Sequence, residues 1–244
     1  MISDEPETAK WSRAASAPSD EVRIIYVRPG RTPSAHPPRP ARDMDESPFT
    51  IILKELIERI RGAYAAALVD RDGESVDYAG DIPPFDIKIA AASWRIVLSQ
   101  VGDVRNIGKA SFISIRAKNQ TVALYALPDG YALVVLLRRR GGLAGTVRAF
   151  SACVYALATE AGWHLTSDVA PWFPVSVDCD ARHRPTRIVY GGLAEPVEVL
   201  GIVSGNHARL TRRERGYRIR LASGPEITIV REATGHWYAE ERFG

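Results

Sequence analysis

The chain has 244 residues, enough for one large domain or two small ones with connecting segments. Hydrophobic residues make up 45% and charged residues 25%, as in ordinary soluble proteins, and the net charge of +3 is not concentrated in one region. Nucleic-acid-binding proteins usually concentrate basic charge, so this balance argues against nucleic acid as a partner.

The sequence also argues against a membrane-spanning protein, a secreted protein and a protein stabilised by disulfides or zinc. No apolar run reaches the ~20 residues that span a bilayer, and the N-terminal MISDEPETAK is acidic where a signal peptide is basic and then apolar. Only Cys153 and Cys179 are present, without a CxxC motif, which argues against a disulfide framework or a zinc site. We therefore expect a cytoplasmic protein with no membrane span and no cofactor.

The N-terminal segment, residues 1–46, is predicted to be a disordered, proline-rich tail. Eight of the sixteen prolines lie within the first 48 residues, and such a composition cannot bury enough apolar surface to offset its ordering entropy. Residues 21–28, EVRIIYVR, have the composition of a strand. Ile24 and Tyr26 are therefore candidate partner-binding residues that could add to a sheet edge, although the segment could also stay disordered or pack on its own domain.

A helix and a hairpin are predicted next. Ser47 as N-cap and Pro48 at the first helical position begin a helix with one apolar face, which Gly62 ends. Residues 64–69 and 74–79 are strand-like and flank the turn signature DRDG.

Residues 84–101 predict a helix with apolar residues on two opposite sides. One stripe contains Phe85, Ile89, Ala92 and Ile96, and the other contains Ile87, Ala91, Trp94, Leu98 and Val101. A helix that covers its own sheet needs one stripe only, so the other is expected to be buried against a second layer or a second copy. We expect the Ile87 stripe on the sheet and the Phe85 stripe in a dimer interface, although the sequence also allows the reverse.

Three strands and a helix complete this part. Residues 108–116, 121–127 and 131–137 predict an antiparallel meander with short turns, and residues 143–161 predict a helix that Gly162 closes. The order is α-β-β-α-β-β-β-α.

These elements resemble the roadblock family of dynein light chain relatives over residues 49–162. The resemblance rests on the strand-turn-strand AALVDRDGESVDYAG, the two-faced helix that follows, and the strand pair ending in LPDGYALVVLL. It implies an α+β fold with a five-stranded antiparallel sheet, the middle helix on one face, and homodimers that pair those helices and often join the sheets. It also implies a non-enzymatic regulator or scaffold for small Ras-like GTPases, as in bacterial polarity and motility.

The C-terminal part is predicted to be all-β. Residues 163–174 are predicted to be a linker, and residues 175–244 a small barrel-like domain of six strands at 175–179, 186–191, 197–203, 216–222, 226–231 and 236–242. This pattern resembles a small bacterial β-domain of unknown function, and it implies no activity.

Candidate sites outside the central helix are few. Arg138, Arg139 and Arg140 could meet an acidic partner or a nucleotide phosphate, or they could be a solvated strand end. The arginines of residues 209–220 could face RNA, but an ordinary charged hairpin explains them as well. Since no catalytic arrangement and no GxxxxGK[ST] motif is present, we expect a non-enzyme. A sensory module that holds a small molecule between sheet and helix is the alternative to a GTPase regulator.

Overall fold

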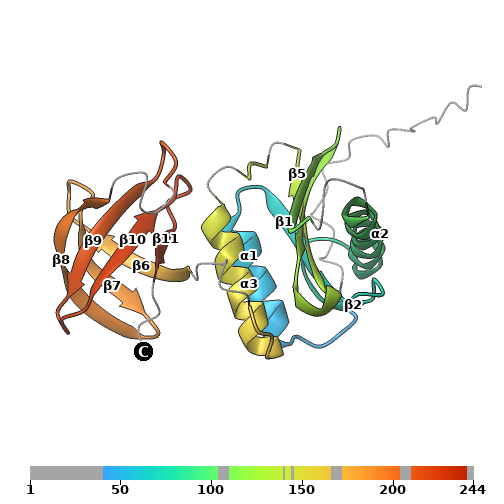
Figure 1. Cartoon of the computed structure of the whole chain (residues 1–244), viewed down its shortest axis with the longest axis horizontal. Helices are drawn as coiled ribbons and strands as arrows, with labels where there is room; N and C mark the ends of the chain where they lie inside the picture. The colour runs from blue at the N-terminus through green and yellow to red at the C-terminus, as the bar shows by residue number, and fades with distance from the viewer. Residues whose placement is uncertain are drawn as a thin grey trace, which may run out of the picture. The chain divides into compact units, whose positions relative to one another are not determined.

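The computed structural model describes residues 41–103, 110–139, 141–143, 146–165, 172–203 and 210–240. These residues form a helix-covered sheet followed by a barrel (Figure 1). The predicted α+β class is confirmed, with a five-stranded antiparallel sheet and a closed six-stranded antiparallel barrel after it.

The first part follows the predicted order of elements. It consists of α1 (Pro48–Arg59), β1 (Ala63–Val69), β2 (Ser75–Gly80), α2 (Pro84–Gly102), β3 (Phe112–Arg116), β4 (Gln120–Ala126), the 3-10 turn η1 (Pro128–Gly130), β5 (Ala132–Arg138) and α3 (Val147–Ala161). The strands lie in the order β2-β1-β5-β4-β3, so β2 and β3 are the sheet edges.

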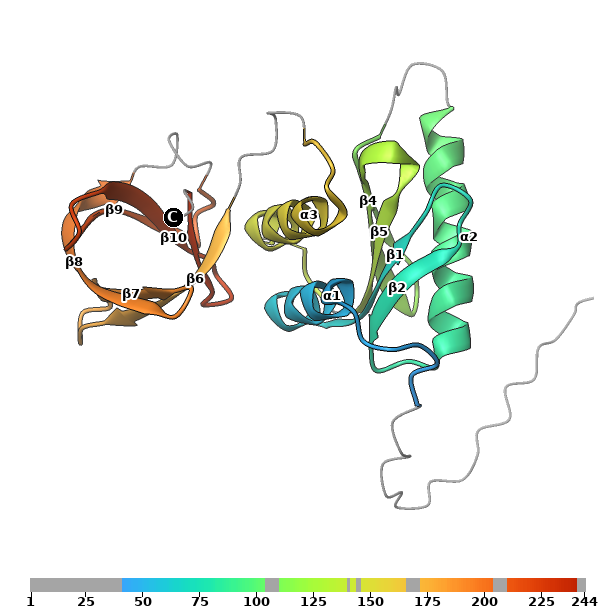
Figure 2. The ribbon, with the colours of Figure 1, turned by 90° about the horizontal axis from the view of Figure 1, so that it is seen from below.

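Helices cover both faces of the sheet. Figure 2 shows α1 and α3 on one side and α2 on the other. Strand β1 is buried on both sides: Ala66 and Leu68 belong to the core with α1 and α3, whereas Ala65 and Ala67 belong to the core with α2. A strand buried on both faces needs a continuous apolar sequence, which explains the AYAAALV of β1 and the ALVVLLR of β5.

The helix ends differ from the predictions for local reasons. Helix α1 starts at the predicted cap, where Ser47 Oγ accepts from the Phe49 N–H, but it ends at Arg59 because Ile60 is extended. Gly62 instead makes the turn into β1 with a positive φ of 88°, where an added Cβ would lie 2.7 Å from Gly141 Cα. Helix α3 begins at Val147 and ends as predicted, with Gly162 in the left-handed conformation.

The barrel contains β6 (Phe173–Cys179), β7 (Pro185–Tyr190), β8 (Leu193–Val203), β9 (Arg215–Leu221), β10 (Glu226–Arg231) and β11 (Trp237–Ala239), closed in the order β10-β11-β6-β7-β8-β9. Its interior is filled by alternate residues of every strand, among them Ile188, Ile219 and Ile229, each with no exposed surface.

Two strand starts in the barrel were predicted too late. Strand β6 already begins at Phe173, inside the predicted linker, because Phe173 and Pro174 pair with Ala239 and Tyr238. Strand β8 begins at Leu193 and runs through Pro196. Proline has no N–H to donate to a β-ladder, so the sequence did not indicate a strand at Pro196. In the structure the Pro196 carbonyl accepts a hydrogen bond from the Ala222 N–H.

Candidate functional site: the outward face of helix α2

Helix α2 carries two apolar faces, as its sequence predicted. Ile87, Ala91 and Leu98 are buried against β1, β4 and β5. On the opposite side, Phe85, Ile89 and Ile96 expose 72%, 53% and 57% of their surface. Ala92 is partly exposed between them, so the spacing of 4, 3 and 4 residues makes one continuous apolar stripe along the helix.

Three polar side chains beside this stripe make hydrogen bonds within the chain. Ser93 Oγ donates to the Ile89 carbonyl at 2.8 Å, and Ser99 Oγ donates to the Ile96 carbonyl at 2.7 Å. Arg95 Nε donates to the Gly130 carbonyl at 3.1 Å. Because these donors have partners, covering the stripe would leave few polar groups without hydrogen bonds. The face is therefore suited to burial against a protein surface.

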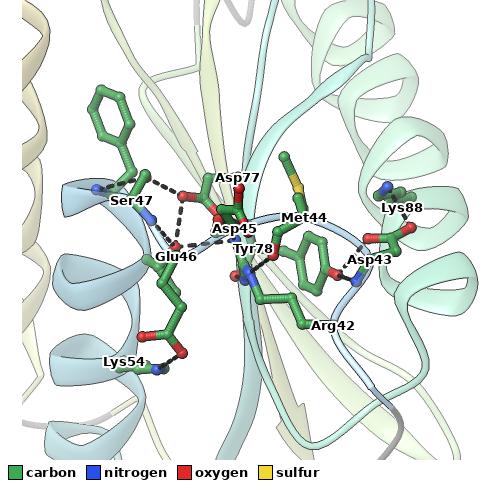
Figure 3. A network of polar contacts seen from close by, with 12 residues as sticks. Arg42, Asp43, Met44, Asp45, Glu46, Ser47, Lys54, Asp77, Tyr78 and Lys88 are labelled. Carbon is green, nitrogen blue, oxygen red and sulfur yellow. Dashed lines mark hydrogen bonds and ion pairs between the residues drawn. The ribbon is translucent and has the colours of Figure 1, made fainter.

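A polar network holds the chain at the start of α2 and at the edge strand β2 (Figure 3). Asp77 of β2 has 1% of its surface exposed and accepts hydrogen bonds from Arg42, from Ser47 Oγ and from Thr50 Oγ1, the last at 2.8 Å. Burial alone would raise the pKa of Asp77, but the hydrogen bonds from Ser47, Arg42 and Thr50 outweigh it and hold the pKa below its ordinary value. The carboxylate is thus kept charged.

The same segment is tied to α2 itself. Lys88 Nζ lies 2.8 Å from Asp43 Oδ2, and Tyr78 donates its phenolic O–H to Asp43 Oδ1 at 2.6 Å. The hydrogen bonds from Lys88 and Tyr78 lower the pKa of the Asp43 carboxyl. Residues 42–46, which the sequence placed in the tail, are therefore anchored between β2 and the N-terminal end of α2.

This network also closes one of the two sheet edges. Successive residues of β2 direct their backbone N–H and C=O groups alternately toward β1 and away from it. The Asp81 N–H bonds to the Tyr64 carbonyl of β1, so the N–H and C=O of Tyr78, three residues earlier, point away from β1. Asp77 Oδ1 accepts from that N–H at 2.6 Å, and Arg42 donates to that C=O. Strand β2 is therefore blocked at Tyr78 against pairing with another strand.

The sequence did not predict this network. Ser47 was predicted only as a helix cap, and Asp77 looked like one polar residue in an alternating strand. The available signal was that ESVDYA puts Asp77 on the same side as buried residues, where a carboxylate needs partners. Its main cationic partner, Arg42, lies 35 residues earlier in the chain.

Of the other candidate residues, the structure describes Arg138 and Arg139. Arg138 and Arg139 are exposed at the end of β5. Arg140, Ile24 and Tyr26 lie outside the described residues, so the structure does not place them.

The described residues offer no candidate metal site. Their histidines, cysteines and carboxylates form no group of three or more that could hold a metal ion. Cys153 is a core residue, and burial raises the pKa of its thiol. No helix of the described residues is long and apolar enough to cross a bilayer.

Comparison with solved structures finds roadblock domains. The roadblock/LC7 domain from Streptomyces avermitilis is 17% identical, with a TM-score of 0.42, and the similarity covers 46% of this chain and 97% of that one. MglB from Myxococcus xanthus is 14% identical, covering 47% and 94% with a TM-score of 0.41. The gliding protein MglB from Thermus thermophilus is 17% identical, covering 50% and 97% with a TM-score of 0.41.

No protein-family model and no curated protein matches the sequence. The element order and the sheet topology nonetheless agree with what the resemblance implied, and the resemblance to the roadblock family is confirmed at the level of the fold. The similarity spans about half of the chain, and the barrel lies in the other half.

Proposed function

We propose that the protein is a non-catalytic homodimeric regulator or scaffold that binds a small Ras-like GTPase in the cytoplasm. The observation that carries the dimer is the exposed stripe of Phe85, Ile89 and Ile96 on α2. The regulatory role follows from the resemblance to the roadblock family, whose bacterial members commonly regulate such GTPases.

The α2 stripe supports self-association on energetic grounds. Three large apolar side chains, each more than half exposed, contribute several kcal/mol when two copies bury them at ~25 cal/mol per Å². A twofold contact between two α2 helices places each stripe against the same stripe of the partner, so no separate complementary surface is needed.

The dimer is tested by sedimentation at micromolar concentration. Wild type is expected to sediment at about twice the chain mass of 26.8 kDa. The double variant Ile89→Asp/Ile96→Asp is expected to be a folded monomer, since the charges lie on an exposed face but would be desolvated in a dimer. Ile51→Asp is the matched control, because Ile51 is 56% exposed on α1, and this variant should remain dimeric. A monomeric wild type contradicts the dimer.

Binding of a GTPase is tested by a separate measurement on the same proteins. Purified Ras-like GTPases from the source organism, loaded with GTP or with GDP, are titrated onto the immobilised wild-type protein. At least one is expected to bind with different affinities in its two nucleotide states. Arg138 and Arg139 are candidate contacts for an acidic patch on it. If none binds, the regulatory role is wrong while the dimer stands.

The alternative is a sensory or general interaction module without a GTPase partner. A small-molecule sensor would need a closed cavity between the sheet and a helix. The space between the sheet and α2 is filled by Tyr78, Ile87, Leu98 and Val134, all buried, which favours the regulator over the sensor.

A further inference from the structure

The C-terminal barrel is closed through a short pairing of β6 with β11, and beyond that pairing its wall is split. Strand β11 pairs with β6 only at Trp237 with Val175, Tyr238 with Pro174 and Ala239 with Phe173. Strand β6 continues to Cys179, and its residues 176–179 pair with β7 alone. On the other side of the split, the chain turns from β10 into β11 through a tight turn in which the Gly235 N–H bonds to the Glu232 carbonyl.

A cavity of about 840 Å³ opens at this split. Its apolar wall includes Val175, Val177 and Trp237, which belong to the barrel interior. Its polar rim includes Arg231 and His236 of the β10-β11 turn, and Arg59 of α1. Its volume is in the range of small-molecule binding sites, and apolar walls with a few polar groups are the usual lining of such sites.

Arg231 is the unusual member of this lining. It is partly buried, and its Nε is inaccessible to solvent and has no hydrogen-bond partner among the described residues. No described carboxylate forms an ion pair with it, and its guanidinium lies 6.0 Å from the ring centroid of Trp237. A partly desolvated cation without a counter-charge costs free energy, so an anion at this position would be favourable.

Two nearby carboxylates, Asp180 and Glu232, are engaged outside the cavity. Asp180 Oδ1 accepts the backbone N–H groups of Arg182 and Arg184 within its own turn. Glu232 faces Arg148, Glu214 and Thr234. Neither Asp180 nor Glu232 lines the cavity, whose one acidic lining residue is Glu58. Positive charge predominates in the lining, where Arg59 and Arg231 stand against Glu58. A second cavity of about 280 Å³ is lined by Arg231, Arg213 and Arg215 together with Glu232.

His236 contributes polarity and no charge. Burial, and next the nearby Arg59, lower the pKa of His236 below its ordinary value of 6.5, so its imidazole is neutral at pH 7. It is therefore a hydrogen-bonding group beside the cations Arg59 and Arg231.

We propose that this cavity binds a small organic anion. Its carboxylate or phosphate group pairs with the guanidinium of Arg231, and its apolar or aromatic part lies against Trp237 and Val177. A planar guanidinium suits a two-pronged contact with either kind of anion. This site is separate from the α2 face, so the barrel would add ligand binding to the protein independently of its dimerisation.

The experiment follows the indole N–H resonance of Trp237 by NMR in the full-length protein. Phenyl phosphate and phenylacetate are titrated as probes, with inorganic phosphate as the probe that lacks an aromatic part. At least one aromatic probe is expected to shift the Trp237 resonance saturably, and inorganic phosphate to bind about tenfold or more weakly. The better of the two aromatic probes distinguishes a phosphate site from a carboxylate site.

The variants test the role of Arg231. Arg231→Met is expected to weaken the binding of that probe by about tenfold or more, because an ionic hydrogen bond is lost. Arg187→Met, which removes an exposed arginine from β7 of the same barrel, should leave it unchanged. Arg231→Lys keeps the charge and is the second variant if the methionine variant does not fold, and it should bind more weakly than wild type. No saturable shift, or equal binding by the folded Arg231 variants, overturns the proposal.

Discussion

The Asp77 side chain binds three parts of the fold at once: the segment before α1, the start of α1 and the edge strand β2. Its two carboxylate oxygens accept from Arg42, Ser47 and Thr50, and one of them also accepts the Tyr78 N–H. A buried carboxylate with this many donors is stabilised in its charged form, while its replacement by a neutral group leaves some of the donors without an acceptor.

We predict that Asp77→Asn destabilises the fold by about 2 to 3 kcal/mol, because Arg42 loses its counter-charge and the amide cannot accept all the donors. Urea unfolding at pH 7 measures this effect. Asp81→Asn, at an exposed position just after the same strand, is the control and should change stability by less than about 0.5 kcal/mol. Equal midpoints for wild type and Asp77→Asn would show that the network carries no net stability.

At the scale of elements, the two sheet edges differ. Strand β2 is blocked at Tyr78, whereas β3 is free along its outer side in the described residues. The Ala117 N–H bonds to the Gln120 carbonyl and the Ala126 N–H bonds to the Ser111 carbonyl. By alternation along the ladder, the N–H groups of Phe112, Ser114 and Arg116 point away from β4. If two copies join their sheets, β3 is the edge that does so.

We therefore predict that Ser114→Pro weakens the dimer by about tenfold while the monomer stays folded, because proline removes an outward N–H at an edge position that tolerates it. Sedimentation across a concentration series gives the dissociation constant, and circular dichroism reports the fold. Ser114→Ala keeps the N–H and should dimerise like wild type. An unchanged dissociation constant for the proline variant would mean that the helices pair without the sheets.

The sequence predicted those features that depend on local pattern. The order of elements, the two faces of α2 and the cap at Ser47 follow from apolar spacing and from turn chemistry, which act within a few residues. The start of β6 at Phe173 was missed because its pairing partner, Ala239, lies far along the chain. The start of β8 at Leu193 pairs locally with Tyr190, and it was missed because Pro196 interrupts the strand pattern.

The candidate sites were predictable only in part. The outward stripe of α2 repeats along one helix and could therefore be found by periodicity. The Asp77 network and the Arg231 cavity bring together residues that are far apart in the chain, such as Arg42 with Asp77. Trp237 packs in the barrel interior, and its place beside a partly buried arginine depends on the barrel register.

At the scale of the molecule, α1 and α3 share a core with barrel residues. Val230 and Tyr238 point outward from the barrel and are fully buried in one cluster with Leu53 of α1 and Phe150 of α3. Arg148 Nη1 of α3 lies 2.7 Å from Glu214 Oε1, and both side chains are buried. This contact buries one apolar face of α1 and α3. Ile51 of α1 and Val147 of α3 remain exposed as single residues, whereas α2 exposes a continuous apolar stripe.

A third ionisable group, Glu232, lies in this junction and makes it sensitive to pH. Burial raises the pKa of Glu232 to about 7, the attraction of Arg148 opposes the rise, and repulsion from Glu214 adds to it. In the unfolded chain the carboxyl has an ordinary pKa near 4.5. Between these two values the folded protein keeps a proton that the unfolded chain has released, so the contribution of Glu232 to stability falls as pH rises through this window.

We predict that Glu232→Gln removes this penalty. The free energy of unfolding of the variant, relative to that of wild type, should increase between pH 4.5 and pH 7 by up to about 3 kcal/mol. Above pH 7 this difference should stay constant, because the wild-type carboxylate is then charged in both the folded and the unfolded state. Urea unfolding of both proteins at several pH values gives the difference between their free energies of unfolding. The contributions of the other titrating groups, such as His236, are the same in both proteins and cancel in this difference. Glu160→Gln, exposed on α3, should give a flat difference over the same range. A flat difference for Glu232→Gln itself would show that Glu232 titrates normally in the folded protein, and that the junction between α3 and the barrel holds no buried proton.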